Sequence, residues 1–504
     1  MALSVIYVSP EAVPFSKTGG LADVAGALPL ALKGRGAAVS VFLPLHRQTA
    51  AGGFVLADTG VTVSVPIGAK EVKGRVLKGA GAGVDVYFIK CDEYFDRTHL
   101  YAFQDGDAFV DYSDNLERYA FFSRGVLEAV RALKIRPDII HANDWQTGLI
   151  PAYLKDVYRQ DPFFSKARSA FTIHNLAYQG LFPAALYGLT GLGKGLFTLK
   201  GLEFWGKVSC LKAGIVYSDV ITTVSRTYAK EIQTTAYGCG LEGLLKERKD
   251  DLHGIVNGVD YNEWDPAVDK FIPANYSPDD LTGKAVCKKE LLKRFGLKVK
   301  ASTPVIGMVS RFTLQKGFDL VAEAAADIME LGAAVVILGT GEKKYQLIAE
   351  GLGAAYPGRF AVHAAFDNSL AHLIEAGSDI FLMPSLYEPC GLNQIYSLKY
   401  GTVPVVRATG GLEDTVKAYP LAGATGFKFK EYDVSALVEK VKEAVLLFKD
   451  KKAWRALQEA AMKEDFSWQE SARRYIEIYG MAVKKQYNRN AAPPPGPPPQ
   501  GGRR

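Results

Sequence analysis

Short apolar segments alternate with helical segments along most of this sequence. The first apolar segment covers residues 3–9, a helical segment follows at 20–33, and a second apolar segment lies at 38–43. Strands that are apolar throughout, rather than at every second residue, are typical of parallel sheets with helices on both faces. Further strands are predicted at 84–89, 139–142, 170–174 and 220–224, and a helix at 115–133. The N-terminal half is therefore predicted to be a doubly wound α/β domain.

The alternation starts again near residue 304. This block is predicted to contain strands at 303–310, 334–338, 360–363, 380–384 and 403–406, and helices at 318–331, near Leu370 and at 392–400. Residues 257–280, between the blocks, show no clear period, so we predict an N-terminal domain at 1–258 and a C-terminal domain at 259–486. Two doubly wound domains in one chain create a cleft, and their ligands bind at the carboxyl ends of the strands.

The last residues of the sequence differ in periodicity and composition from the two blocks. An amphipathic helix is predicted at 468–485, and the Pro- and Gly-rich residues 487–504 are expected to form a disordered tail. The tail is interpreted as dispensable, with a proline-binding partner as the alternative.

Charge and cysteine content exclude several classes of protein. The net charge is +6 over 504 residues, without the clustered basic stripe of a nucleic-acid binder. The five cysteines form no CxxC pair, so neither a zinc cluster nor a disulfide framework is indicated and a reducing compartment is expected. The first residues lack the basic region of a signal peptide, and no apolar segment suits a membrane span. A cytoplasmic protein without nucleic-acid or membrane partners is expected.

A first candidate binding loop is Lys17-Thr18-Gly19-Gly20-Leu21, between the first strand and the first helix. A helix N-terminus attracts phosphate, the paired glycines allow close approach, and Lys17 adds a positive charge. The alternative is a tight turn with an exposed lysine.

A second candidate is the segment 310–317, at the carboxyl end of the first strand of the second block. Arg311 and Lys316 there suit a diphosphate, because arginine binds it with a planar fork and lysine with a compact charge. The alternative is a pair of solvated surface cations.

A third candidate, Glu388-Pro389-Cys390-Gly391-Leu392, precedes a predicted helix. Its backbone N–H groups at Gly391 and Leu392 suit a phosphate, and Glu388 suits a polyol or a developing cation; capping of the helix by the carboxylate is the alternative. Residues 409–412 and 339–342 end strands in the same way as the Lys17 loop. Four further glycines are interpreted as surface turns: Gly74, Gly79, Gly81 and Gly83.

Other motifs are absent or weak. Lys344 interrupts a GxGxxG pattern that begins at Gly339, which disfavours a dinucleotide site. Neither HExxH, a P-loop nor GxSxG occurs. The segment Asp105-Gly106-Asp107 has the residue types of a divalent-cation site but is interpreted as a turn, and Cys390 is interpreted as a packing residue.

The motifs together resemble those of bacterial glycogen synthases, which are related to plant starch synthases. The matching segments are 17–24, 141–145, 172–180, 257–260, 310–317, 388–392 and 409–412. They occur in family order from about residue 3 to 480. Asn143, where the family often has histidine, and Asn393, where threonine or isoleucine is common, are departures that remove no charge.

This resemblance implies a GT-B fold, in which two Rossmann-like domains face a cleft and the C-terminal helix crosses back to the first domain. It implies a hexosyltransferase that moves glucose from ADP-glucose to the non-reducing end of an α-1,4-glucan such as glycogen. The anomeric configuration would be retained, and neither a metal nor another cofactor would be needed. It leaves the oligomeric state open.

The resemblance also assigns roles to individual residues. Glu388, His174, Lys316 and Arg311 would be the catalytic group, with the two cations on the phosphates and Glu388 and His174 on the glucose. Asp144 would belong to the same wall of the site. The donor would further be contacted by Lys17, Gly20, Asp23, Asn257, Phe366 (stacked on adenine), Cys390, Gly391 and Leu392. Tyr94 and Tyr101, with neighbouring aromatic residues, are candidates for stacking on the acceptor, and ordinary packing is the alternative.

Retention of configuration leaves two roles open for Glu388. A carboxylate nucleophile on the opposite face of the sugar would give retention, as in retaining glycosidases. We favour a positioning role, with the departing phosphate deprotonating the acceptor on the same face. The competing functions are an enzyme of the same fold that uses UDP-glucose, one that passes glucose to a small acceptor such as a sugar phosphate, and a non-catalytic glucan-binding homologue. A sugar-nucleotide epimerase would share the fold but not the motifs at 17–21 and 388–392.

Overall fold

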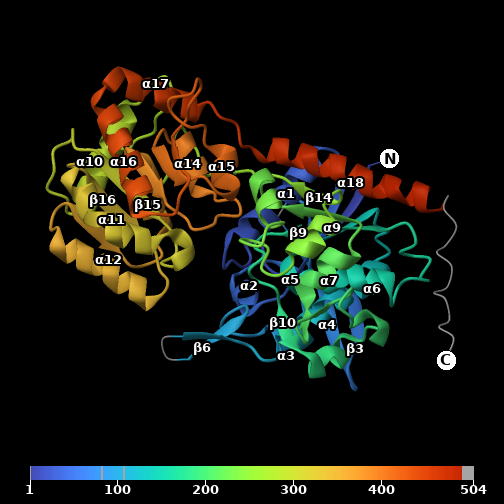
Figure 1. Cartoon of the computed structure of the whole chain (residues 1–504). Coiled ribbons are helices and arrows are strands. Elements are labelled where there is room, and N and C mark those ends of the chain that lie inside the picture. Colours follow the sequence, from blue (N-terminus) through green and yellow to red (C-terminus); the bar gives the residue numbers. More distant parts are fainter. Residues whose placement is uncertain (1, 81–82, 106–107, 491–504) are drawn as a thin grey trace. The chain divides into compact units, whose positions relative to one another are not determined.

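The computed structural model describes residues 2–80, 83–105 and 108–490, which form two compact units. Unit 1 contains the residues up to Phe103, Asp111–Thr222 and the chain from Ala472 onward. Unit 2 contains Gln104–Val110 and Thr223–Ser471. Figure 1 shows the sheets and helices of both units.

The centre of unit 1 is a sheet whose strands follow the order β13-β9-β8-β1-β2-β5-β4-β3. Its parallel strands are β1 (Ser4–Val8), β2 (Ala38–Pro44), β5 (Asp85–Lys90), β8 (Ile139–Asn143), β9 (Arg168–Ile173) and β13 (Val220–Thr223). In β1, Val5 lies opposite Val39 on one side and Ile139 on the other. All the strands predicted in the N-terminal half are therefore confirmed.

An antiparallel hairpin of β3 (Leu56–Ile67) and β4 (Lys70–Gly79) extends this sheet from β5, and its strands were not predicted. The interpretation of Gly74 and Gly79 as surface turns is wrong, because both lie within β4. A Cβ at Gly74 would come 2.8 Å from the Phe121 ring, and one at Gly79 would come 2.9 Å from the Phe88 ring. These glycines make room for rings. Gly83 does lie at a positive φ of 71°, and Gly81 is outside the described residues.

The helices of unit 1 include α1 (Gly20–Gly34), α4 (Asn115–Ala132), α6 (Leu149–Lys155), α7 (Cys210–Tyr217) and the last helix α18 (Trp468–Asn490). Helix α18 packs on the sheet of unit 1, where the Tyr479 hydroxyl lies 2.7 Å from Nδ1 of His141 in β8. It continues to Asn490 and so includes the first four residues of the predicted tail. Residues 491–504 lie outside the described part of the chain.

Unit 2 is built on a parallel sheet with the order β17-β16-β15-β18-β19-β20. These strands are β15 (Val305–Val309), β16 (Ala334–Leu338), β17 (Phe360–His363), β18 (Ile380–Met383), β19 (Val403–Arg407) and β20 (Phe427–Phe429). The strands predicted at 303–310, 334–338, 360–363, 380–384 and 403–406 are confirmed.

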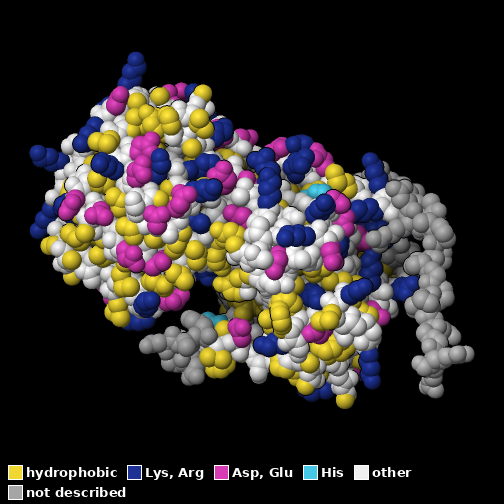
Figure 2. Space-filling view, in the orientation of Figure 1, with side chains coloured by type: hydrophobic (Ala, Val, Ile, Leu, Met, Phe, Trp, Pro, Cys, Tyr) yellow, Lys and Arg dark blue, Asp and Glu magenta, His cyan; other side chains and the backbone are white. Residues whose placement is uncertain are grey.

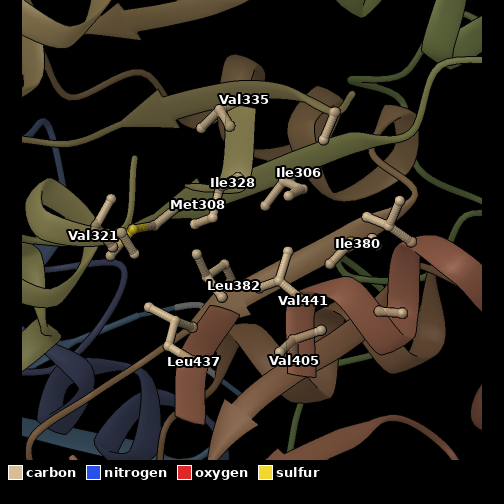
Figure 3. Close-up of a cluster of buried hydrophobic side chains, with 14 of the residues drawn as sticks. Ile306, Met308, Val321, Ile328, Val335, Ile380, Leu382, Val405, Leu437 and Val441 are labelled. Atoms are coloured by element: carbon tan, nitrogen blue, oxygen red, sulfur yellow. The ribbon is translucent and has the colours of Figure 1, made fainter. Parts of the chain in front are cut away.

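Helices cover both faces of the unit 2 sheet. On one face, α11 (Phe318–Glu330) and α16 (Val434–Lys449) pack against Ile306, Val335 and Ile380 (Figure 3). On the other, α10 (Thr282–Arg294) and α13 (Asn368–Gly377) pack against Val305, Val336 and their neighbours. Adjacent residues of one strand therefore enter two different cores, which explains why these strands are apolar throughout.

The remaining elements are short or connect these layers. In unit 2 they include α8 (Arg226–Glu231), α9 (Glu242–Glu247), β14 (Leu252–Gly254), η3 (Leu314–Lys316), α12 (Lys343–Ala355), α14 (Asn393–Lys399), α15 (Gly410–Thr415) and α17 (Lys451–Met462). Elsewhere they are α2 (Arg47–Ala51), α3 (Asp92–Phe95), β6 (Ala102–Asp105), β7 (Ala108–Asp111), α5 (Asp144–Thr147), β10 (Leu181–Pro183), η1 (Ala184–Thr190), η2 (Lys194–Leu196), β11 (Glu203–Phe204) and β12 (Lys207–Ser209). Helix α8 belongs to unit 2 by its contacts, because the Ser225 hydroxyl donates to the carbonyl of Pro389 at 2.6 Å. The single domain boundary at residue 258 stays a prediction.

The distribution of surface charge and the hydropathy of the helices also bear on the class of protein. On the face shown in Figure 2, Lys and Arg side chains are interspersed with Asp and Glu side chains. Among the described helices, none is both long enough and apolar enough to cross a membrane.

Candidate active site

The predicted phosphate loop of unit 1 joins β1 to α1 and is held by a buried carboxylate that the sequence analysis missed. Glu11 is 3% exposed and accepts hydrogen bonds from the Thr18 backbone N–H (2.6 Å) and the Thr18 hydroxyl (2.8 Å). Burial raises the pKa of Glu11 from 4.5 to about 7. The loop therefore has a carboxyl group that changes charge near neutral pH.

Lys17 and Asp23 form an ion pair across this loop. The ammonium of Lys17 lies 2.7 Å from Oδ1 of Asp23, at the start of α1, and the lysine side chain is 45% exposed. Gly20 is the first residue of the same helix. Three predicted donor-binding residues thus lie together, and the lysine remains accessible to an anion.

Asp144 and His174 lie together at the ends of β8 and β9. The backbone N–H of His174 donates to Oδ1 of Asp144 at 2.7 Å. Asp144 has a left-handed backbone conformation with φ 56°, rare for a residue with a side chain. Burial raises the pKa of its carboxyl from 3.8 to about 7. The sharp turn after β8 directs this carboxyl to the first residue after β9.

Asn143 determines which nitrogen of His174 carries the proton. Its amide Nδ2 donates to the carbonyl of Val8 at 3.0 Å, so its Oδ1 is the atom that faces the Tyr7 hydroxyl and His174 Nε2, 3.2 and 3.0 Å away. Since Oδ1 only accepts, Nε2 of His174 carries the hydrogen and Nδ1 is left as an acceptor. Burial lowers the pKa of His174 to about 3, which keeps the ring neutral.

The two candidate acceptor tyrosines have different environments. Tyr94 is 1% exposed, packs against Phe121 with ring centroids 5.4 Å apart, and donates its hydroxyl to Glu117. Its role in the structure is packing, the alternative considered from the sequence, and its ring has no free face for a sugar. Tyr101 is half-buried beside Tyr119 and Trp145, and its acceptor role stays a prediction.

In unit 2 the predicted catalytic residues Lys316 and Glu388 are in direct contact. Lys316 ends η3, after β15, and its ammonium lies 2.6 Å from Oε2 of Glu388, in the loop after β18. The same oxygen accepts a hydrogen bond from the Ser385 hydroxyl at 3.1 Å. Gly317, at φ 76°, lets η3 approach β18, because a Cβ there would overlap the carbonyl oxygen of Pro384.

Arg311 and Phe366 are both exposed, and Phe366 is 83% exposed. Within the described chain the guanidinium of Arg311 has no ion-pair or hydrogen-bond partner. The structure does not bring these two residues into contact with the Lys316–Glu388 pair. Their side chains are accessible to a ligand, and their roles stay predictions.

Cys390 is a buried thiol beside Asn257. The Asn257 backbone hydrogen-bonds to its sulfur, and burial raises the pKa of the thiol to about 12. A thiol with so high a pKa is a poor nucleophile, which agrees with the packing role expected from the sequence. Asn257 is also buried, with 6% exposure.

The loop that follows Cys390 is held by the side chain of Gln394. Its amide nitrogen donates to the carbonyls of Cys390 (3.1 Å) and Gly391 (3.0 Å). Gly391 has a positive φ of 70°, and Leu392 leads into α14. The departure at Asn393 has a structural role, because its amide donates to the carbonyl of Val309 at the end of β15 (2.7 Å).

Residues 409–412 lead from β19 into α15, so this glycine pair lies at the start of a helix after a strand, as predicted by analogy with the Lys17 loop. Gly410 and Gly411 also support the Glu388 loop. The backbone N–H of Gly410 donates to the Glu231 carboxylate at 3.1 Å, and that of Gly411 donates to the Glu388 carbonyl at 3.1 Å. A Cβ on either glycine would overlap a backbone carbonyl, that of Glu388 or that of Cys390. Glu231 lies 179 residues before Gly410, and no local signal identified it.

The described residues contain no group of three His, Cys, Asp or Glu side chains that could hold a metal ion. Gly106 and Asp107, of the segment considered for a cation, lie outside the described part of the chain.

Comparisons with known proteins extend over both units. Residues 4–247 match the model of the starch synthase catalytic domain, and residues 290–463 match that of the group 1 glycosyl transferases. The glycogen synthase of Koribacter versatilis is 50% identical over 483 residues, which are 95% of this chain and 98% of the relative. That of Syntrophotalea carbinolica is 45% identical over 484 residues, 96% and 99% of the two chains.

Solved structures give the same assignment. The catalytic domain of starch synthase IV from Arabidopsis thaliana, bound to ADP and acarbose, matches with a TM-score of 0.88 and 33% identity, covering 96% of this chain and all of that one. Sucrose-phosphate synthase from Thermosynechococcus elongatus, 16% identical with a TM-score of 0.57, shares the fold. The fold is GT-B, and the chain belongs to the glycogen synthase family of glycosyltransferases, whose first domain is of the starch synthase catalytic type.

Proposed function

We propose that this protein elongates an α-1,4-glucan by transferring glucose from ADP-glucose with retention of configuration. Membership of the glycogen synthase family supports the reaction, and the related starch synthase IV was solved with ADP and acarbose. The observation that carries the proposal is the buried Lys316–Glu388 pair, which presents a cation and a carboxylate at the carboxyl end of the unit 2 sheet.

The cations of unit 2 suit the leaving group. When the bond between glucose and phosphate breaks, negative charge develops on the diphosphate. Lys316 and the unpaired, exposed Arg311 would stabilise that charge without reorganisation, and the backbone N–H groups of Gly391 and Leu392 would add hydrogen bonds. No metal ion is needed for this step, so we expect EDTA to leave the rate unchanged.

Glu388 is better suited to position groups than to attack the sugar. One of its oxygens is already shared between the Lys316 ammonium and the Ser385 hydroxyl, which fixes the orientation of the carboxylate. We therefore propose that it holds Lys316 and contacts the glucose, while the departing phosphate accepts the proton of the attacking hydroxyl. Rescue of Glu388→Ala by azide, with a glycosyl azide of inverted configuration, would instead identify a nucleophile.

His174 would act as a neutral hydrogen-bonding group. Its Nδ1 accepts and does not donate, because Asn143 takes the hydrogen on Nε2. This arrangement suits a sugar hydroxyl, which can donate to Nδ1, better than a phosphate oxygen, which cannot. We propose that His174 binds the transferred glucose, with Asp144 fixing the backbone of His174.

The environment in which the protein works is also part of the proposal. All five cysteines are free, and four of them are buried. Free thiols are typical of a reducing compartment, which supports a cytoplasmic location.

The proposal can be tested with maltotriose as a small acceptor and ADP-glucose as the donor. We expect maltotetraose, with a new α-1,4 bond at the non-reducing end shown by proton and carbon NMR. A β-linked product would contradict retention, and a product formed only with a sugar phosphate would change the acceptor class. Absence of turnover with any donor would favour a non-catalytic glucan-binding protein.

A further inference from the structure

Unit 2 contains a pocket of about 310 Å³ whose lining includes none of the candidate active-site residues. One face of α10 and one face of α17 form its walls (both helices are labelled in Figure 1), and Phe448, from the end of α16, also lines it. The volume lies at the lower end of the range for small-molecule sites. It suits a ligand about the size of a monosaccharide derivative.

The lining of this pocket is strongly cationic. Lys284 and Lys288 come from α10, and Lys451 and Arg455 from α17. Both pairs have a spacing of four residues, which places the members of each pair on the same helix face. The single carboxylate of the lining, Asp379, is already paired with Lys288 at 2.6 Å. The lining therefore has an uncompensated positive charge.

The lysines of this lining differ in how many of their N–H groups already donate a hydrogen bond. Lys284 uses all three, donating to the carbonyls of Ala376 and Tyr400 and to the Thr402 hydroxyl. Lys288 donates to Asp379 and to a backbone carbonyl. Lys451 makes a single hydrogen bond, to the Phe448 carbonyl at 2.9 Å. An ammonium group has three donors, so Lys288 and Lys451 can donate further.

Arg455 also has an N–H group to spare. It lies four residues after Lys451, on the same face of α17. It uses Nε for Glu459 and Nη2 for the Pro278 carbonyl, which leaves Nη1 free to donate.

Two ammonium groups share the ring of Phe448. Those of Lys288 and Lys451 lie 5.2 and 3.4 Å from the ring centroid. Burial, together with the charge of Lys288, lowers the pKa of Lys451. An anion placed here would offset the repulsion between the two cations.

We propose that this pocket binds a phosphomonoester with a small, uncharged remainder, of the size of a hexose phosphate. The phosphate oxygens would accept from the ammonium groups of Lys288 and Lys451 and from Nη1 of Arg455. The remainder would lie against the apolar lining from Leu281, Ala285 and Ala301. None of the residues that line this pocket is a proposed donor-binding residue, so the two sites are distinct.

Binding can be measured on the full-length protein by isothermal titration calorimetry and by the shift in melting temperature. The probes are glucose 6-phosphate, inorganic phosphate and, as an uncharged control, glucose. We expect saturable 1:1 binding of glucose 6-phosphate in the presence of saturating ADP, a rise in melting temperature, and no binding of glucose. Equal affinity for inorganic phosphate would identify free phosphate as the occupant and still support the anion site. Displacement by ADP, or absence of saturable binding, would overturn the proposal.

Matched variants of α17 separate the pocket from general charge effects. Lys451→Met should weaken binding about tenfold or more, because it removes a charged hydrogen bond. Lys452→Met, an exposed neighbour outside the lining, should leave binding unchanged. Ala301→Trp should block the pocket and retain every cation, so it tests the site even if Lys451→Met folds poorly. Equal weakening by Lys452→Met, or undiminished binding in Ala301→Trp, would contradict the site.

Discussion

Lys316 and Glu388, 72 residues apart in the sequence, form a 2.6 Å ion pair between the loops that follow β15 and β18. Their side chains are only 17% and 6% exposed, so solvent screens the pair weakly. The carboxylate holds the ammonium in place before any substrate arrives. Such preorganisation is what stabilisation of a leaving diphosphate requires.

Replacement of Lys316 by methionine tests this role. We expect kcat to fall by about 10²–10³, as on removal of one preorganised donor that acts on charge in the transition state. The Lys343→Met variant, at an exposed residue near the same end of the sheet, serves as the matched control and should keep full activity. An unchanged kcat in Lys316→Met, measured at saturating donor, would exclude a role in the transition state.

The hydrogen bond between Asn143 and His174 predicts a distinct pattern of variants. Asn143→Ala should lower kcat by about three- to tenfold, the loss expected for one hydrogen bond that orients the ring. Asn143→Asp should place a carboxylate beside Nε2, raise the pKa of His174 from its value of about 3, and add an ionisation to the pH profile of kcat. Asn143→His, the residue common in the family, should retain activity. A pH profile of Asn143→Asp identical to that of the natural enzyme would argue against this contact.

The raised pKa of Glu11 makes stability depend on pH. The folded chain keeps this proton up to about pH 7, whereas the unfolded chain loses it near 4.5. The folded state therefore binds more protons in this window, and stability falls as the pH rises from about 4.5 to 7. Asp144, with a pKa raised from 3.8 to about 7, adds to the same trend.

Glu11→Gln should abolish the part of this pH-dependent loss of stability that the Glu11 carboxyl causes. At each pH, the effect of the substitution is the free energy of unfolding of the variant minus that of the natural protein. We expect this quantity to be about 2–3 kcal/mol larger at pH 8 than at pH 4.5. Urea denaturation at the two pH values measures the difference. Glu93→Gln, at an exposed position, should show none, and a Glu11→Gln protein that follows the pH dependence of the natural one would refute the assignment.

Gly411 is expected to tolerate no side chain. A Cβ there would overlap the Cys390 carbonyl and displace the loop that carries Glu388. Gly411→Ala should therefore lower kcat at least tenfold and reduce the melting temperature. Gly351→Ala, in helix α12 with open space around it, should instead be stabilising by about 0.5–1 kcal/mol. Similar behaviour of the two variants in an activity assay and a thermal melt would show that the Gly411 contact has no special importance.

The sequence predicted most of the sheets, because strands that are buried on both faces are apolar throughout. Val335 and Val336 illustrate this, since they enter opposite cores of unit 2. The β3–β4 hairpin was missed although a signal existed. Val63, Val65 and Ile67 are buried and alternate with exposed residues, which is the period of a half-buried strand.

The sequence predicted which residues belong to the candidate site but not how those residues contact one another. Lys316 and Glu388 could be selected because each follows an apolar strand. Their ion pair, and the support of Gly410 by Glu231, join segments that are distant in the sequence. Asn143 looked like a neutral departure from the family, and only its three hydrogen-bonding neighbours show that it fixes a tautomer. Tyr94 could not be separated from core residues, because an aromatic side chain suits a core as well as a sugar.

The central claim is that the enzyme moves glucose from ADP-glucose to a glucan. The most direct test offers glycogen and either labelled ADP-glucose or labelled UDP-glucose, and measures label in the precipitated polymer with the kcat/KM for each donor. We predict incorporation that strongly favours ADP-glucose, persists in EDTA and is lost in Lys316→Met. Incorporation from UDP-glucose alone would contradict the donor assignment, and no incorporation from either donor would contradict the claim itself.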